Sequence, residues 1–248
     1  MSAPFNNLGV QSYCFRGFKE NAKVAELVKE IGLSAIEICG VHADFNDPPS
    51  FDNVIKTYRD AGVDILAIGV QTFTGDTDKE RQWFEFAKKA GAKYISAHFN
   101  PDTWEHAVKK TSKLCDEYGI QIALHNHGGY QWMGSSDMLS HIFKSTGKQI
   151  GLCMDTAWCL DAGEDPIKWA EKFGDRLYGL HIKDFIFHRN RKQEDVVVGT
   201  GNLDLPKLIE KCNAADFNGY AVLEYEGDVD NPVPALKKCV EQVRNAVK

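Results

Sequence analysis

The second half of the chain contains four side chains of the kinds that bind divalent metal ions, each at the end of a β-rich run. They are two imidazoles and two carboxylates: His125, Asp155, His181 and Glu224. This mixture of nitrogen and oxygen ligands suits Mn²⁺, Zn²⁺, Fe²⁺ or Co²⁺, whereas Mg²⁺ and Ca²⁺ prefer oxygen ligands alone. We therefore expect one divalent ion bound by these four residues, provided that the fold gathers the ends of the four runs.

Taken one at a time, these residues have simpler interpretations. A lone aspartate after a strand is more often a helix cap than a ligand, and a lone histidine is more often a hydrogen-bonded polar side chain. The metal site is favoured because the same position recurs after four consecutive runs. His127 points the same way as His125, since side chains alternate along an extended chain. His127 can therefore be a ligand, a base or a substrate contact, or it can hold a loop by hydrogen bonds.

A repeat along the chain supplies the elements that position these residues. An amphipathic stretch ends at a glycine, and a short β-rich run follows within about three residues. The glycines lie 27 to 30 residues apart by subtraction of their numbers, and they are Gly32, Gly62, Gly91, Gly119, Gly147 and Gly174. This interval is the length of one strand, one helix and two short loops. We predict that each glycine ends a helix in the left-handed conformation.

Eight β-rich runs alternate with the amphipathic stretches, so the predicted fold class is α/β. The predicted strands are residues 8–13, 34–39, 64–70, 93–97, 120–124, 150–154, 176–180 and 220–224. We predict a single (β/α)8 TIM barrel domain over residues 1–248, because the alternative, an open doubly wound sheet, lacks a G-x-G-x-x-G turn. In a barrel the residues after the strands meet at one face. The polar segment 184–202 then forms a long loop on that face.

The composition excludes several classes of protein. The chain has 248 residues and a formal charge of −6, without the dense basic face that nucleic acid requires. No apolar run approaches the ~18 residues of a membrane span, and the first residues resemble no leader peptide, so we expect a cytoplasmic protein. Seven cysteines without a C-x-x-C pair are expected to be reduced core residues. A homo-oligomer is compatible with this size.

The motifs at the strand ends resemble those of the xylose-isomerase-like barrels, the sugar phosphate isomerase and epimerase family. The likeness covers essentially the whole chain. It rests on His-Asn-His at 125–127, Met-Asp-Thr at 154–156, Leu-His-Ile-Lys-Asp at 180–184, Gly-Thr-Gly-Asn-Leu-Asp at 199–204 and Leu-Glu at 223–224. The resemblance implies a Mn²⁺-type site, with Zn²⁺, Co²⁺ or Fe²⁺ as alternatives, and a small carbohydrate as substrate.

Two departures from the family pattern bear on the reaction. Well-known ketose epimerases of the family carry a glutamate where this chain has His125, and a histidine shortly after the Asp-Thr pair, where this chain has Ala157 and Trp158. Those epimerases use one carboxylate on each face of the sugar. Here only Glu224 remains of that pair, so epimerisation with two bases would recruit His127, Lys183 or Glu226. The branch that cleaves DNA needs further ligands and a basic face, and neither is evident.

The leading hypothesis is a divalent-metal-dependent isomerase or epimerase that acts through an enediolate on a keto-sugar or its phosphate. The alternatives are a lyase, either a keto-polyol dehydratase or a 3-keto-glycoside β-eliminase, and a carbohydrate-binding barrel without catalysis. We expect Glu224 or His127 to be the base. Lys183 is expected to supply positive charge to an oxygen or a leaving group, or else to form a salt bridge with Asp184 or Asp155.

Substrate contacts are expected from groups near the same barrel mouth, since aromatic faces pack on sugar C–H surfaces. The predicted contacts are Phe15, His98, Trp132, Trp158 and Glu226. The segment 199–202 could bind a phosphate through its backbone N–H groups, although a turn followed by a cap at Asp204 explains it nearly as well. Arg189 and Arg191 in the long loop could reach an anionic substrate or remain solvated.

Overall fold

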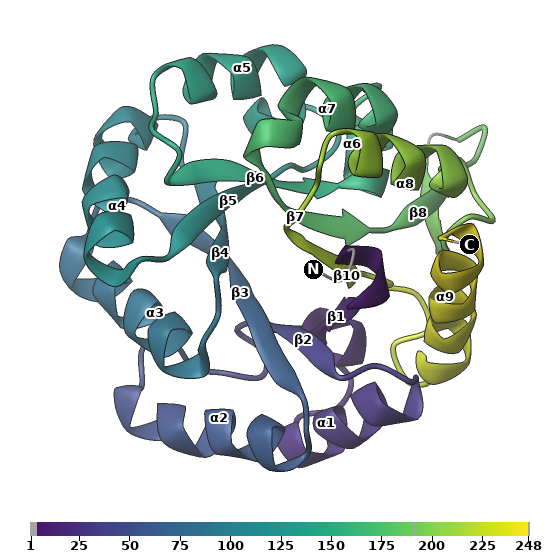
Figure 1. The fold of residues 1–248 in the computed structure, drawn as a ribbon, viewed down its shortest axis with the longest axis horizontal. Coiled ribbons are helices and arrows are strands. Elements are labelled where there is room, and N and C mark those ends of the chain that lie inside the picture. The colour runs from purple at the N-terminus through teal and green to yellow at the C-terminus, as the bar shows by residue number, and fades with distance from the viewer. Residues whose placement is uncertain (1–3, 191, 248) are drawn as a thin grey trace.

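In the computed structural model, residues 4–190 and 192–247 are described, and within them eight parallel strands close into a barrel. The order around the barrel is β1-β10-β7-β6-β5-β4-β3-β2, so each strand lies beside its neighbours in sequence (Figure 1). Their bounds are β1 Gly9–Gln11, β2 Ala35–Ile38, β3 Asp64–Phe73, β4 Tyr94–Phe99, β5 Gln121–His125, β6 Ile150–Asp155, β7 Leu177–Ile182 and β10 Tyr220–Leu223. The predicted (β/α)8 barrel is confirmed.

Helices form an outer ring around the sheet, as Figure 1 shows. Each turns its apolar stripe inward; α3, for example, buries Trp83, Phe84, Phe86 and Ala87 against the strands. The α-helices are α1 Asn21–Glu30, α2 Phe51–Asp60, α3 Thr77–Ala90, α4 Trp104–Tyr118, α5 Ser136–Lys144, α6 Thr156–Asp161, α7 Pro166–Phe173, α8 Leu205–Ala214 and α9 Val233–Ala246. Short 3₁₀ turns cover Pro4–Asn6, Ser12–Phe15, Pro48–Ser50, Trp132–Gly134 and Gly174–Arg176.

The glycine repeat predicted most of the helix ends but not all of them. Four of the six glycines have the expected positive φ, namely Gly32, Gly62, Gly91 and Gly119. The prediction is wrong for Gly174, whose φ is −51° and which begins a 3₁₀ turn. A Cβ there would lie 2.6 Å from the Cβ of Ala215, so close packing explains this glycine. Gly147 is also outside the left-handed region, and a Cβ there would meet the side chain of Gln149.

The long polar segment after β7 contains regular structure that its composition did not predict. Asp184–Phe187 forms β8 and Gln193–Val196 forms β9, and the two pair as an antiparallel ribbon. Arg191 lies outside the described residues. The ribbon belongs to the connection between β7 and α8, and therefore to the barrel face at which the strands end.

The interior of the barrel is mainly apolar but contains a few polar groups. All seven cysteines belong to the described residues, and each is buried and free, as expected. Glu37, Ser96 and His181 are also fully buried on the inward side of the strands. No helix among the described residues is long and apolar enough to cross a membrane.

Candidate metal centre and active site

The four proposed ligands come together at the carboxyl ends of their strands. His125 and Asp155 are the last residues of β5 and β6, His181 is the next to last of β7, and Glu224 directly follows β10. One atom from each, an imidazole nitrogen or a carboxylate oxygen, can be chosen so that all four lie within 4.8 Å of one another. The closest pairs are His125 Nε2 to His181 Nδ1 at 3.0 Å and His181 Nδ1 to Glu224 Oε2 at 2.9 Å.

Sheet register and two short side chains hold these strand ends in place. Asp155 pairs with His181 across β6 and β7. The amide of Asn126 donates to the backbone carbonyl of Asp155 at 2.9 Å and accepts its N–H at 2.8 Å. The hydroxyl of Thr156 in turn accepts the N–H of Lys183 at 3.0 Å. The residues beside the candidate ligands therefore lock neighbouring strands together, so the ligands have little freedom to separate.

Asp155 shows how one carboxylate can serve two purposes. Its Oδ1 accepts the N–H of Trp158 at 2.8 Å and so caps α6, which is the simpler interpretation made from the sequence. Its Oδ2 is buried, has no hydrogen-bond partner among the described residues, and lies 3.8 Å from Nε2 of His125. Burial raises the pKa of this carboxyl well above its usual range. An unpartnered buried oxygen that faces two imidazoles is what a cation site requires.

Glu37 on β2 completes the surroundings of His181, and the sequence analysis missed it. Its Oε2 accepts a hydrogen bond from Nε2 of His181 at 2.9 Å and from the hydroxyl of Tyr94 at 3.2 Å. The hydroxyl of Ser96 donates to the other oxygen. If a metal ion displaces the proton of Nδ1, the hydrogen bond from Nε2 to Glu37 keeps the other proton in place and leaves the lone pair of Nδ1 facing the ligand cluster. The available signal was a single acidic residue inside the apolar run 34–39.

The electrostatics of the four ligands follow from burial and mutual proximity. Burial lowers the pKa of His125 well below its usual range, so this imidazole is neutral. Burial alone would lower the pKa of His181, but Cys153, Glu37 and Glu224 raise it well above that range. Burial would raise the pKa of Glu224, but Lys183 and His181 hold it well below its usual value. The cluster therefore contains a ready carboxylate and a neutral imidazole, the forms that bind metal.

A cavity of about 430 Å³ opens above this cluster at the barrel mouth. His125 and Glu224 form part of its lining, together with His127, Trp158 and Glu226. His127 stacks on Trp158 with ring centroids 5.2 Å apart, and burial lowers the pKa of its imidazole. Because β5 and β10 are three strands apart in a ring of eight, His127 and Glu224 approach the cavity from widely separated directions.

The other predicted substrate contacts lie elsewhere. His98 packs edge-on against His127 at 4.9 Å, but it lines a neighbouring cavity of about 490 Å³ together with Trp132. Burial lowers the pKa of His98 to about 4. Phe15 is completely buried in the core, because the 3₁₀ turn after β1 directs it inward. That placement corrects the expectation that Phe15 contacts a substrate.

Lys183 is buried beside the cavity, and its ammonium group is paired with carboxylates. It forms ion pairs with Glu226 and, at 3.5 Å, with Asp195 on β9. Its Nζ also lies 5.4 Å from the ring centroid of Trp158. Burial alone would lower its pKa, but Glu224, Asp155 and Glu226 raise it above the usual range. The alternative expectation of a salt bridge to Asp184 or Asp155 is wrong, because Asp195 on β9 and Glu226, three residues after β10, lie closer to Lys183.

The expectation of a phosphate site at residues 199–202 is also wrong. The backbone N–H groups of this turn donate to the carboxylate of Asp184, at 2.9 Å from Gly199 and 2.8 Å from Gly201. Asp204 caps α8, as the alternative interpretation predicted. Arg189, in the turn of the ribbon, is absent from the described lining of the mouth cavity.

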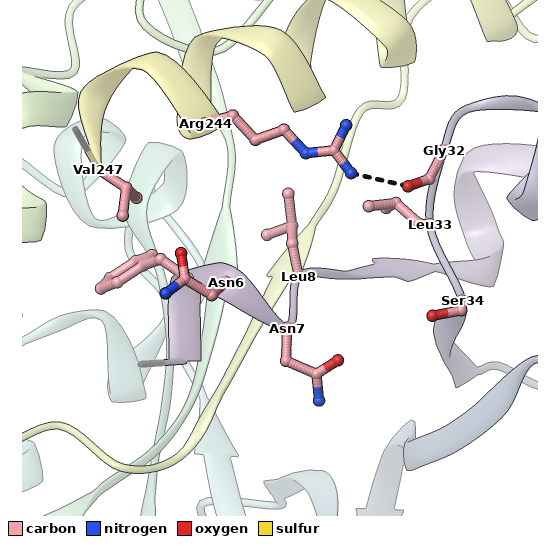
Figure 2. Close-up of a pocket in the computed structure, with 9 residues that line it drawn as sticks. Asn6, Asn7, Leu8, Gly32, Leu33, Ser34, Arg244 and Val247 are labelled. Carbon is pink, nitrogen blue, oxygen red and sulfur yellow. Dashed lines mark hydrogen bonds between the residues drawn. The ribbon is translucent and has the colours of Figure 1, made fainter. Parts of the chain in front are cut away.

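A larger cavity, of about 560 Å³, lies at the opposite end of the barrel. Figure 2 shows Asn6, Asn7, Leu8 and Ser34 around it, and Arg244 reaching across to the carbonyl of Gly32. These residues precede strands β1 and β2 or belong to α9. The described lining contains one exposed arginine and no other ionisable side chain. Residues at this end of a (β/α)8 barrel generally serve stability, so we place the active site at the mouth.

The fold and the site together describe a (β/α)8 barrel with a candidate metal site at the carboxyl ends of its strands. The chain belongs to the xylose isomerase-like TIM barrel family, whose model matches residues 25–245. It is 23% identical over 91% of its length to an inosose dehydratase of Geobacillus kaustophilus, covering 87% of that protein. It is 24% identical over 82% of its length to a 3-oxo-isoapionate decarboxylase of Pectobacterium atrosepticum, covering 77% of that protein.

Comparison with solved structures supports the same fold. The crystal structure of a 3-keto-D-glucoside 4-epimerase from E. coli superposes with a TM-score of 0.73 at 18% identity. The match covers 96% of this chain and 99% of that one. At this identity the likeness concerns the fold, and the reaction has to be argued from the site.

Proposed function

We propose that the protein is a sugar-processing enzyme, specifically a divalent-metal-dependent isomerase or epimerase that acts through an enediolate on a keto-sugar. The observation that carries this proposal is the gathering of four ligand atoms within 4.8 Å at the floor of the mouth cavity. We propose His125, Asp155, His181 and Glu224 as the ligands and Mn²⁺ as the preferred ion. A cation in that position supplies Lewis-acid polarisation of a carbonyl that carries a neighbouring hydroxyl.

The cavity offers two groups that can move the proton at the carbon next to that carbonyl. Glu224 has a carboxylate that is ionised and one-tenth exposed to the cavity, and His127 has a neutral imidazole held by stacking on Trp158. We propose that one removes the proton and the other returns it. Their approach from strands three places apart allows delivery to a different face or a different carbon. The indole face of Trp158 packs against sugar C–H groups.

Solvent isotope exchange tests this proposal. The protein, loaded with Mn²⁺, is incubated with ketoses and 3-keto-glycosides in deuterated water, and carbon-bound protons are followed by NMR. We expect exchange at the carbon next to the carbonyl together with an isomer or epimer of the substrate. The Glu224→Gln and His127→Gln variants should each lose isomer formation. The proposal fails if metal-loaded protein exchanges no proton of any compound tested.

A lyase is the second candidate, and one observation favours it. The Nε2 of His125 lies 3.0 Å from Nδ1 of His181 in the ligand cluster, at the place where the family resemblance implies a glutamate in the two-carboxylate epimerases. A β-elimination can proceed with a single base, so Glu224 or His127 would suffice. The inosose dehydratase among the relatives carries a lyase name. Loss of water or an alcohol with formation of an ultraviolet-absorbing enone would assign the protein to this class.

A further inference from the structure

We infer that the substrate is an unphosphorylated sugar, because the carboxylate of Asp184 occupies the group of backbone N–H donors that a phosphate would need after β7. This inference rests on the proposed function and narrows its substrate class. We call these donors the amide cradle; they are the N–H groups of Gly199, Gly201, Asn202 and Leu203.

The contacts of Asp184 use the cradle completely. Oδ2 accepts the N–H groups of Gly199 and Gly201 at 2.9 and 2.8 Å. Oδ1 accepts those of Asn202 and Leu203, each at 2.9 Å. The residue is fully buried. Four bonds from N–H groups to one carboxylate are charge-assisted, and removal of the carboxylate would leave these four N–H donors without their acceptor.

The turn is packed closely around the carboxylate of Asp184, so a second anion cannot reach the same N–H groups while Asp184 is in place. Gly199 has a φ of +81°, which bends the backbone so that its N–H groups converge. At Gly201 a Cβ would lie 2.6 Å from Oδ1 of Asp184 and 2.6 Å from the carbonyl oxygen of Phe185. The following N-terminus of α8 is satisfied as well, since Asp204 accepts the N–H of Lys207 at 3.1 Å. The carboxylate of Asp184 is therefore the anion that binds the amide cradle.

The charged residues around the mouth cavity give a second reason to expect an unphosphorylated substrate. Among the residues that the structure describes, the cavity lining includes the carboxylates of Glu224 and Glu226 but no lysine or arginine. Lys183 lies behind the lining and is paired with Glu226 and Asp195. Arg16 at the rim donates to the backbone carbonyls of Tyr13 and Glu226. Within the described lining, a phosphate dianion would therefore find no lysine or arginine side chain with which to pair.

The first experiment compares a ketose with its phosphate ester on the wild-type, metal-loaded protein by isotope exchange. We expect kcat/KM to be at least about 100-fold higher for the unphosphorylated sugar. A preference for the ester would overturn the inference and leave the proposed function intact. Absence of exchange with both compounds would count against the proposed function, and the inference is then decided by the binding experiment below.

The second experiment needs no turnover. Thermal unfolding of wild type, Asp184→Ser and Asp184→Asn is followed with rising inorganic phosphate, and with sodium chloride at equal ionic strength. We expect phosphate to leave the wild-type melting temperature unchanged and to raise that of Asp184→Ser, with a smaller rise for the isosteric Asp184→Asn, which still offers one acceptor. Asp195→Asn, a buried carboxylate outside the cradle, is the control and should not respond. Phosphate stabilisation of wild type as large as that of the Asp184 variants would overturn the inference.

The third experiment tests the charge of the cavity. Removal of the carboxylate in Glu226→Gln should shift the ratio of kcat/KM values toward the phosphate ester by about tenfold. Asp195→Asn removes the other partner of Lys183 but is not part of the lining, so its ratio should change less. An equal shift in both variants would mean that Lys183, rather than the facing carboxylate, controls selection. That result would contradict the assigned role of Glu226.

Discussion

The two ends of the barrel carry cavities of similar size but of different chemistry. The mouth cavity, about 430 Å³, lies over two imidazoles and two carboxylates that are almost entirely buried. The opposite cavity, about 560 Å³, is lined by asparagines, small residues and apolar side chains, with one exposed arginine (Figure 2). Cavity size therefore does not locate the active site here. Buried ionisable groups locate it, because a fold retains such costly groups only where other interactions compensate their desolvation.

The sharpest test of this contrast removes a ligand charge at the mouth. Asp155→Asn keeps an oxygen that can cap α6 but loses the negative charge that faces the cluster. We expect bound metal to become sub-stoichiometric and kcat/KM to fall by about a thousandfold or more, since Lewis-acid stabilisation is worth several kcal/mol. Metal analysis and kinetics measure both. The matched control is Asp165→Asn, which alters the cap of α7 and should leave metal content unchanged.

Glu37→Gln should have the next largest effect, although this residue lies beneath the cavity. The amide can no longer act as a charged acceptor for Nε2 of His181, so His181 loses its fixed tautomer. We expect metal affinity, measured by competition with a chelator, to fall about 10- to 100-fold. Ser96→Ala removes a donor to the other oxygen of Glu37 and should weaken metal binding much less. Unchanged affinity in Glu37→Gln would show that this carboxylate serves packing alone.

The pH dependence of stability should also come from the mouth. Burial raises the pKa of Asp195 to about 7, above the value of about 4 for an unfolded chain. The folded state therefore binds this proton more tightly, and the stabilisation is complete below about pH 4 and is lost as pH rises through about 7. We expect Asp195→Asn to melt at a similar temperature to wild type at pH 4 and several degrees higher at pH 8. A difference independent of pH would contradict this assignment.

The smallest effect is expected at the opposite end of the barrel. Arg244 donates to the carbonyl of Gly32 at 2.8 Å on an exposed surface. Arg244→Ala should lower the free energy of unfolding by no more than about 1 kcal/mol, as expected for one exposed hydrogen bond. Metal content and kcat/KM should match wild type. A large loss of activity in this variant would break the distinction between the two ends.

The sequence predicted the fold well because its signals are local and repeated. The near-constant spacing of Gly32, Gly62, Gly91 and Gly119 reflects the length of a βα unit, and each of these residues has the conformation expected of it. The failure at Gly174 has a different origin. There a glycine is required by close packing against Ala215, which lies about forty positions later in the chain. No local sequence pattern reveals such a contact.

For the site, the sequence by itself determined which chemistry is available and at which strand ends it stands: His125, Asp155, His181 and Glu224. Only the tertiary structure decided that Glu37 holds His181, that Lys183 pairs with Glu226 and Asp195, and that Asp184 fills the amide cradle. The physical reason is that the type of a residue and its position in a strand follow from the local sequence. The partner of a buried charge depends instead on closure of the sheet, which brings the side chain of Glu37 on β2 to His181 on β7, and on the β8–β9 ribbon, which brings Asp195 to Lys183.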